Sequence, residues 1–495
     1  MSAPHKTFSG ILNLSLNLNL SLTLALLLSL AATQTTNAQL TAPDMSLEAY
    51  GVVSSSGTTP FWLQSNRYGM FAPDGSHLLT RFQAHGSEDL WNDRLNLSYG
   101  ADLIARPGSS STLSFNQGYL RLDAWGLYLQ AGRFHNFSPA HDEELGMGSL
   151  GVSGNSTPIP QIRAGLADWT SIPFTRNFVQ IRAHMAHGWL ENGRYIEDVL
   201  YHEKVGHARF GGDFPLNLYG GIAQYVLWGG IRPDGVQLPN TFSDFWRVFI
   251  AVGGDEDAPG EDRNFILGDH KGAWDFGFYL ELDAFNMKVY RQFPIETKDN
   301  LKLKSPQDAL TGITIQPGST SSLPFRQITY EYLYTKHQDG PRRENIGGDL
   351  TRDRYRGNEN YYNHGTYRTG WVYNGQTIGN PLFVPSSDPN IGVFNNRIVA
   401  HHLGISFTLP RNVTLTTKGT FSRNYGKRWD NRIPEDPEKE PLFNPSIDQW
   451  SFFAGFETPV SWAGQSFTIL AEAGFDNGLL IGDQVGLLFG IRWMP

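Results

Sequence analysis

The stretch that decides the fold is the last strand-like segment, Gln-Val-Gly-Leu-Leu-Phe-Gly-Ile-Arg-Trp at residues 484–493. One set of alternate positions carries Val485, Leu487, Phe489, Ile491 and Trp493. The other set includes Gln484, Gly486, Gly490 and Arg492. Because successive side chains of a β-strand point to opposite sides, this segment predicts one apolar and one mostly polar face. Its length and pattern are typical of a strand in a membrane β-barrel, with lipid outside and a polar lumen inside.

The same alternation recurs along the chain. Further strands are predicted at residues 94–104, 179–185, 274–281, 285–290, 327–335 and 413–421. Their polar rows include charged side chains such as Asp102, Arg182 and Lys288, which suit a wet lumen. A soluble β-sandwich would alternate in the same way. The strand lengths and the terminal aromatic strand favour an all-β, transmembrane antiparallel barrel of about 16–18 strands, with short helical or loop elements as periplasmic or plug parts.

The first 38 residues are typical of a secretory signal peptide. His5 and Lys6 precede a mainly apolar run at residues 20–32, and Thr36-Asn37-Ala38 fits a cleavage site. A transmembrane anchor is the alternative, but the run is too short to cross about 30 Å of hydrocarbon as a helix. The chain contains no Cys, so no lipid-anchored cysteine is expected at the boundary. The sequence therefore predicts export to the bacterial outer membrane.

Composition supports the same class. The net charge of −9 argues against a nucleic-acid partner, which would favour a basic surface. Only 40% of residues are hydrophobic, whereas 13% are aromatic and 53 are glycine. Such a balance suits a barrel in which only alternate residues meet lipid and aromatic girdles mark the interfaces.

The expected organisation has three parts. These are a signal peptide at residues 1–38, an N-terminal periplasmic or plug segment at 39–76, and a barrel at 77–495. Long loops are expected near 135–160, 337–396 and 427–446. A short helix is expected at 244–251, with Asp244 as its N-cap, lying as a lid or plug.

Several short motifs resemble one family. The matching segments are Gly146-Met147-Gly148, residues 153–160 (Ser-Gly-Asn-Ser-Thr-Pro-Ile-Pro), Tyr201-His202-Glu203-Lys204, Trp228-Gly229-Gly230, Gly268-Asp269-His270, residues 360–364 (Asn-Tyr-Tyr-Asn-His), Gly370-Trp371 and residues 378–381 (Ile-Gly-Asn-Pro). In this order they resemble the Wzi family of capsule-assembly proteins, in the form seen in Bacteroidetes-type bacteria. The chain departs from a usual barrel ending because its last residue is Pro495, so Trp493 is expected to serve as the terminal aromatic.

The resemblance implies a function as well as a fold. It implies an outer-membrane barrel of about eighteen strands with a helical periplasmic element. It also implies a non-enzymatic, lectin-like protein that attaches or assembles capsular or extracellular polysaccharide at the cell surface. The expected partners are that polysaccharide, outer-membrane lipid and, during biogenesis, the barrel-assembly machinery. The barrel is expected to be monomeric and to need no cofactor.

One loop concentrates the residue types that bind sugars. The candidate polysaccharide-binding residues are Tyr361, Tyr362, His364, Tyr367, Arg368, Trp371 and Tyr373. Aromatic faces can pack on the C–H faces of pyranose rings, and Arg can bond to hydroxyls or uronate carboxylates. The alternative is a folded loop whose aromatic rings pack on one another and plug the lumen.

No catalytic or metal site is expected. His202, Glu203, Asp269 and His270 lack the spacing of a metal motif, and no nucleophile elbow is present. His401 and His402 should point to opposite faces of a strand and could not share a metal. A passive porin or solute channel is the main alternative function, and an outer-membrane hydrolase that uses Asp269 and His270 is a third.

Overall fold

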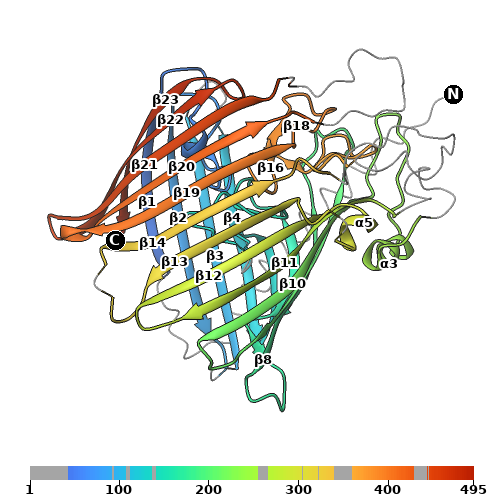
Figure 1. Ribbon diagram of the computed structural model, residues 1–495, viewed down its shortest axis with the longest axis horizontal. Coiled ribbons are helices and arrows are strands. Elements are labelled where there is room, and N and C mark those ends of the chain that lie inside the picture. The colour runs from blue at the N-terminus through green and yellow to red at the C-terminus, as the bar shows by residue number, and fades with distance from the viewer. Residues whose placement is uncertain are drawn as a thin grey trace, which may run out of the picture. The chain divides into compact units, whose positions relative to one another are not determined.

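The computed structural model describes residues 43–91, 94–107, 112–136, 141–254, 266–303, 305–321, 323–338, 359–427, 443 and 445–494. The expected signal peptide, Pro495, the acidic run at 435–440 and the greater part of the loop at 427–446 lie outside these residues. Residues 43–495 form one compact unit, and Figure 1 shows its strands wrapped into a barrel.

The barrel wall is one antiparallel sheet of 19 strands in the described part of the chain. Its strands are β1 (Asp44–Ser54), β2 (His77–Asp89), β3 (Leu95–Arg106), β4 (Thr112–Ala124), β5 (Leu127–Arg133), β6 (Gln161–Leu166), β7 (Thr170–Ser171), β8 (Val179–Trp189), β9 (Leu200–Phe210), β10 (Leu216–Trp228), β11 (Asp269–Glu281), β12 (Phe285–Ile295), β13 (Ala309–Pro317), β14 (Phe325–Tyr334), β19 (Ile398–Leu409), β20 (Val413–Asn424), β21 (Ile447–Trp462), β22 (Gln465–Gly478) and β23 (Gln484–Met494). Because β6 and β7 both pair with β8, they share one place, and the wall is an 18-strand barrel.

The two terminal strands close the barrel. In the β1–β23 pairing, Leu47 lies opposite Trp493 and Ser54 lies opposite Gly486. On its other edge β1 pairs with β2, so no edge of the sheet is left open there. The sequence-based boundary that placed the barrel at 77–495 is therefore wrong for residues 44–54, which form a wall strand.

Alternation sorts the wall into two faces, as predicted. On β23, Val485, Leu487, Phe489 and Ile491 are exposed on the outside, whereas Gln484 and Leu488 are buried on the inside. Exposed aliphatic and aromatic side chains recur on the outer face of other strands, for example Leu218 on β10 and Phe276 on β11. This is the surface that a barrel presents to lipid.

The connections differ in length at the two ends of the barrel. Both terminal strands have their chain-end residues, Asp44 and Met494, at the end where connections are short, which we call the turn end. Long connections lie at the opposite end, called the loop end. They carry α2 (Phe61–Gln64), α3 (Phe242–Ile250), α5 (Lys298–Leu301) and the short strands β15 (Val372–Tyr373), β16 (Gln376–Thr377), β17 (Val384–Pro385) and β18 (Val393–Asn395). The 3₁₀ turn η1 (Pro410–Asn412) is at the turn end.

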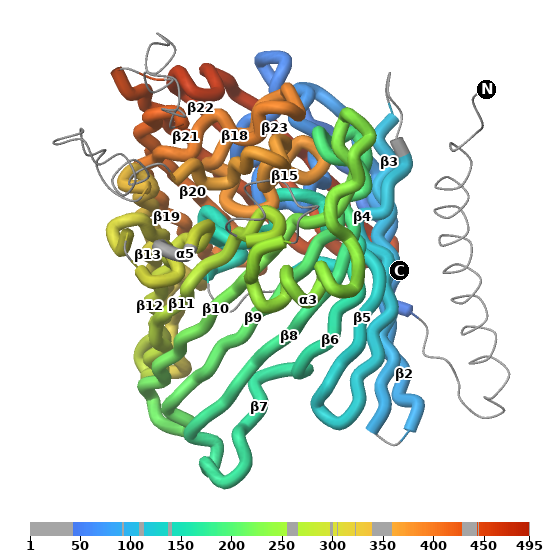
Figure 2. The backbone as a smooth tube through the Cα atoms, turned by 90° about the vertical axis from the view of Figure 1, so that its right-hand side faces the viewer, coloured from blue at the N-terminus to red at the C-terminus, as the bar shows by residue number. Residues whose placement is uncertain are grey.

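Three loop-end connections fold into the lumen and form what we call the plug, residues 59–71, 141–160 and 359–397. The indole of Trp62 donates a hydrogen bond to Thr420 on the inner face of β20, and Leu63 lies against Gly474 and Gly486. Leu145, Met147 and Phe383 are fully buried. Most of the buried apolar core thus lies inside the barrel at the loop end, and Figure 2 shows these segments gathered there.

Two further expectations require correction. The helix near residue 244 exists as α3, but its N-cap is Thr241, and Asp244 is the third helical residue of a capping box. It is neither lid nor plug, because it packs on the outer wall. The helices of the described residues lie in loop-end connections, not at the turn end where the family resemblance implied a periplasmic element. None of these helices has the length and apolarity needed to cross a membrane.

Candidate functional site

The loop that carries the predicted sugar-binding residues turns into the lumen. Its five large aromatic rings are almost wholly buried: Tyr361 1% exposed, Tyr362 3%, Tyr367 2%, Trp371 0% and Tyr373 0%. A sugar could stack on these rings only if the plug opened. In this structure the rings are packing elements of the plug.

Polar groups of four of these five rings, all except that of Tyr373, bond to the protein itself. The Trp371 indole donates to the carbonyl of Gly151 at 2.7 Å, and Tyr362 donates to the carbonyl of Leu150 at 2.7 Å. Tyr361 donates to Asp308 at 2.8 Å. Buried Tyr and Trp side chains generally need such partners. These bonds join the loop at 359–397 to the loop at 141–160 and to the barrel rim, so the plug is one interlocked body.

Two residues of the predicted set remain accessible. Arg368 is exposed, and its guanidinium carbon lies 4.7 Å from the centre of the Tyr195 ring. His364 is half-buried, and its Nδ1 accepts the backbone N–H of Thr366 at 3.2 Å. The side chain of Asn374 is also exposed on this rim. We call these four loop-end residues, Arg368, Tyr195, His364 and Asn374, the rim patch.

A half-buried carboxyl, that of Glu191, supports the rim patch. Glu191 accepts the backbone N–H of Asn374 at 3.1 Å and pairs with Arg194 at 3.2 Å. Arg194 in turn donates to the carbonyl of Gly370 at 3.0 Å. Burial raises the pKa of the Glu191 carboxyl, while Arg194 acts in the opposite direction. These contacts fix the backbone that follows Arg368, from Gly370 to Asn374.

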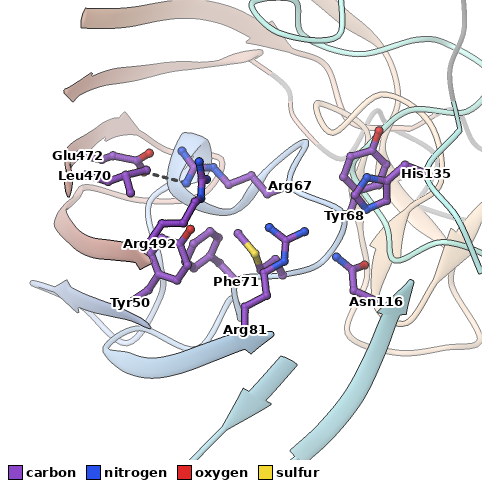
Figure 3. Close-up of a pocket in the computed structure, with 11 residues that line it drawn as sticks. Tyr50, Arg67, Tyr68, Phe71, Arg81, Asn116, His135, Leu470, Glu472 and Arg492 are labelled. Carbon is purple, nitrogen blue, oxygen red and sulfur yellow. Dashed lines mark ion pairs between the residues drawn. The ribbon is translucent and has the colours of Figure 1, made fainter. Parts of the chain in front are cut away.

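A second feature, missed by the sequence reasoning, is a cavity of about 260 Å³ inside the barrel, which we call the luminal cavity. It lies between the first plug segment and the seam where the two terminal strands meet (Figure 3). It is lined by Tyr50, Arg67, Tyr68, Met70, Phe71, Arg81, Asn116, His135, Leu470, Glu472 and Arg492.

Ion pairs run along one side of the luminal cavity. The buried carboxylate of Glu48 accepts hydrogen bonds from Arg492 at 2.6 Å and from Tyr50 at 2.7 Å, and Arg81 lies 3.4 Å away. Arg81 also donates two hydrogen bonds to the carboxylate of Asp102, at 2.8 and 2.6 Å. Because Arg492 comes from the last strand and Glu48 from the first, this network ties the closing seam of the barrel.

Aromatic side chains form the other side of the luminal cavity. The rings of Tyr68 and His135 stack at a centroid distance of 3.5 Å, and Arg67 lies over Phe71 while pairing with Glu472 at 2.8 Å. Burial, with Arg81 nearby, lowers the pKa of His135 to about 3, so its ring is neutral at physiological pH. The amide oxygen of Asn116 is buried without a hydrogen-bond donor within the described residues.

The residues suggested for hydrolysis do not meet. Asp269 points into the barrel, where its carboxylate pairs with Lys271 at 2.5 Å. The side chain of His270 lies on the outer face of the wall. There its Nε2 donates a hydrogen bond to the carbonyl of Leu267 at 2.9 Å, and its Nδ1 accepts one from Gln224. His202 likewise faces outward, where its ring contacts that of Phe245 at a centroid distance of 5.3 Å. His401 is exposed and His402 buried, which confirms that they occupy opposite faces.

Comparisons with known proteins agree with this architecture. Among solved structures, the Escherichia coli outer-membrane protein Wzi, described as a carbohydrate-binding β-barrel involved in group 1 capsule assembly, aligns with a TM-score of 0.55 and 15% identity, covering 91% of this chain and 84% of that one. Pseudomonas aeruginosa OpdL and OpdO each align at 9% identity with a TM-score of 0.46, covering 92% of this chain and 98% and 97% of theirs. At 15% identity the likeness to the Escherichia coli protein concerns the fold alone, and no conclusion is drawn from the two alignments with TM-scores below 0.5.

Sequence comparison supplies the family. No protein of curated function matches the chain. The family model described as capsule assembly protein Wzi, however, matches residues 24–393, which is more than half of the sequence and includes all three plug segments up to Val393. Together with the barrel, this match shows that the chain belongs to the Wzi family of capsule assembly proteins.

Proposed function

We propose that this outer-membrane barrel binds capsular or related extracellular polysaccharide at the cell surface and holds it there without cleaving it. The observation that carries the proposal is the plug. Three connections fill the lumen at the loop end and are joined by buried hydrogen bonds, so that end of the barrel is a rigid surface. In barrels of this class the long loops face the exterior, where a capsule polymer would be met.

The rim patch is the proposed contact surface. Arg368 offers a planar set of N–H donors that suits a carboxylate or a pair of hydroxyls, and it is held against the Tyr195 ring. His364 lies four residues away on the same loop. Within the predicted set, Arg368 and His364 would touch polymer, while Tyr361, Tyr362, Tyr367, Trp371 and Tyr373 would hold the loop in shape.

The luminal cavity ranks second as a sugar site. Arginine, aromatic and amide side chains surround it, and these residue types can recognise an acidic sugar. Each of its three arginines, however, already pairs with a carboxylate: Arg67 with Glu472, Arg81 with Asp102 and Arg492 with Glu48. A bound anion would have to compete with those pairs. We therefore assign the network mainly to closing the barrel.

The proposal is tested in the cell that makes the polymer. Deletion of the gene should release capsule into the medium, and the wild-type chain should restore retention at the surface. A variant with Arg368→Ala should reach the membrane in normal amount yet restore retention less well. Full capsule retention in the deletion strain would contradict the proposal.

A passive porin remains the competing function, and it makes a different prediction. An open barrel of this size would conduct ions steadily in a planar bilayer. The interlocked plug predicts little current from the wild-type protein. Steady conductance of porin size would favour the channel and count against a sealed lumen.

A further inference from the structure

A nine-residue helix, α3, lies against the outside of the barrel wall near the loop end. It belongs to the connection between β10 and β11. In Figure 2, which looks onto this side of the molecule, α3 crosses in front of the strands below it. The ring of Phe245 contacts Trp228 on β10, His187 on β8 and His202 on β9, with centroid distances of 6.2, 6.2 and 5.3 Å.

The wall beneath α3 is polar on the side that elsewhere meets lipid. His187 and His202 pair across β8 and β9, and Lys204 follows on the same outer face. On that face Met185 lies opposite Lys204, and Leu218 lies nearer the turn end; both are exposed apolar side chains typical of a membrane belt. Charged and polar side chains are unfavourable where a barrel faces lipid. Without a cover, these three residues would interrupt the belt.

The helix covers that polar patch with suitable contacts. Lys204 donates a hydrogen bond to the carbonyl oxygen of Phe249, and its ammonium lies 4.4 Å from the centre of the Phe249 ring. Val248 is fully buried against Val226 and Trp228 of the outer wall and against Leu267 in the connection to β11. A capping box between Thr241 and Asp244 fixes the start of the helix. The side of α3 that faces the barrel is therefore occupied by contacts with the wall.

Among the described residues, none covers the outer side of α3, which is apolar. Phe242, Trp246 and Ile250 follow one another at intervals of four residues, so they form a stripe along one side of the helix. Their side chains are 75%, 48% and 62% exposed. Stripes with Trp and Phe are typical of helices that lie in the membrane interface. Here the stripe continues the surface of exposed apolar side chains on the wall, including Trp189 at the loop end of β8.

We propose that α3 is embedded in the outer leaflet of the membrane, with Phe242, Trp246 and Ile250 in contact with lipid acyl chains at the upper edge of the hydrocarbon layer. The helix replaces a polar stretch of wall by an apolar surface, so the lipid-facing belt is continuous around this side of the barrel. This contact is independent of polysaccharide binding at the rim patch, and either can fail without the other.

The chain contains no cysteine, so one introduced thiol can carry a single nitroxide label. Labels at Trp246→Cys and Ile250→Cys are compared with Leu218→Cys on the outer wall and with Asp234→Cys, an exposed residue in the same connection. The protein is reconstituted in phospholipid vesicles. Collisions of each label with oxygen, which concentrates in lipid, and with a water-soluble nickel chelate are then measured. The heat-dependent gel shift of folded barrels checks that each variant has folded.

The proposal predicts that labels at 246 and 250 prefer oxygen, as the label at 218 does. A preference for the nickel chelate, like that of the label at 234, would overturn it by placing the stripe in water. Low collision with both reagents would also overturn it, because a second copy or another protein would then cover the stripe. If one variant fails to fold, the other still decides the question.

Discussion

Trp371→Ala should loosen the plug and not remove a sugar-stacking ring. The Trp371 side chain is fully buried, and its ring centre lies 6.2 Å from that of Tyr201 and 5.9 Å from that of Tyr225, both on the inner wall. Its indole N–H bonds to the carbonyl of Gly151, and its backbone N–H and C=O bond to Tyr362 and Ile378. The side chain therefore joins two plug segments to the wall.

The expected cost follows from these contacts. Truncation of a buried Trp to Ala costs about 3–5 kcal/mol, because apolar contact is lost and a cavity remains. Loss of the bond to Gly151 leaves a buried carbonyl without its donor, a penalty of about 1–3 kcal/mol that is partly contained in the first figure. We expect a total near 4 kcal/mol. Trp371→Phe keeps most of the ring volume and should cost about 2 kcal/mol, mainly for the lost bond.

Native-state hydrogen exchange measures this effect locally. The backbone amides of Trp371, Ile378 and Ser153 are all bonded within the plug. A loss of about 4 kcal/mol in the plug corresponds to exchange roughly a thousandfold faster, since about 1.4 kcal/mol is tenfold. Amides of the wall strands should change little. Trp189→Ala, which removes an exposed Trp from the outer wall, is the matched control and should leave plug exchange unchanged.

One result would refute this reasoning. If Trp371→Ala left plug exchange unchanged and still weakened polysaccharide binding, the ring would have to be reachable by sugar. The buried position would then not represent the binding state, and the loop aromatics would regain the stacking role that the sequence suggested.

Three other predictions follow from the sites described above. Arg368→Ala should weaken polysaccharide binding about tenfold, because one charge-assisted hydrogen bond is lost. Arg232→Ala, a loop-end control, should not weaken binding. Equal losses of affinity for the two variants in a titration would contradict a specific role for Arg368. Glu48→Gln should lower the free energy of unfolding, measured in urea, by about 2–3 kcal/mol. This is less than the usual cost of breaking a buried ion pair, because Arg492 is 30% exposed. An unchanged urea midpoint would show that the network does not stabilise the closing seam. Because the pKa of His135 is lower in the folded protein, the unfolded chain binds this proton first as the pH falls. The free energy of unfolding should therefore decrease as the pH is lowered from about 6.5 to 3, and His135→Gln should make that decrease smaller. Parallel pH profiles for the wild-type protein and the variant would exclude the effect.

The period-two pattern predicted the barrel because lipid and lumen demand opposite side chains at successive residues. It was not recognised at β1, although Met45, Leu47 and Val53 face outward and Ser46, Glu48 and Ser54 face inward. The contrast is weak only in the middle of the strand, where Ala49 and Gly51 face outward and Tyr50 and Val52 inward. What identifies β1 as a strand is its pairing with β23, a partner more than four hundred residues away along the chain, and no local pattern reports that.

The same limit applies to the candidate site. Aromatic composition identified the loop at 359–381 as unusual, and the open alternative, that its rings plug the lumen, describes where the structure places them. Whether a ring faces solvent depends on distant partners, since the Trp371 indole bonds to Gly151, 220 positions earlier. The luminal cavity was missed for a related reason, because Glu48 and Arg492 meet across 444 positions.

The central claim is that a plugged, non-enzymatic barrel binds surface polysaccharide. Its most direct test is a binding titration of the purified, folded barrel with capsular polysaccharide from the same bacterium, with the polymer length measured before and after. The account predicts saturable binding, weakened by Arg368→Ala, with no change in polymer length. Absence of binding, or shortening of the polymer by the barrel, would contradict it.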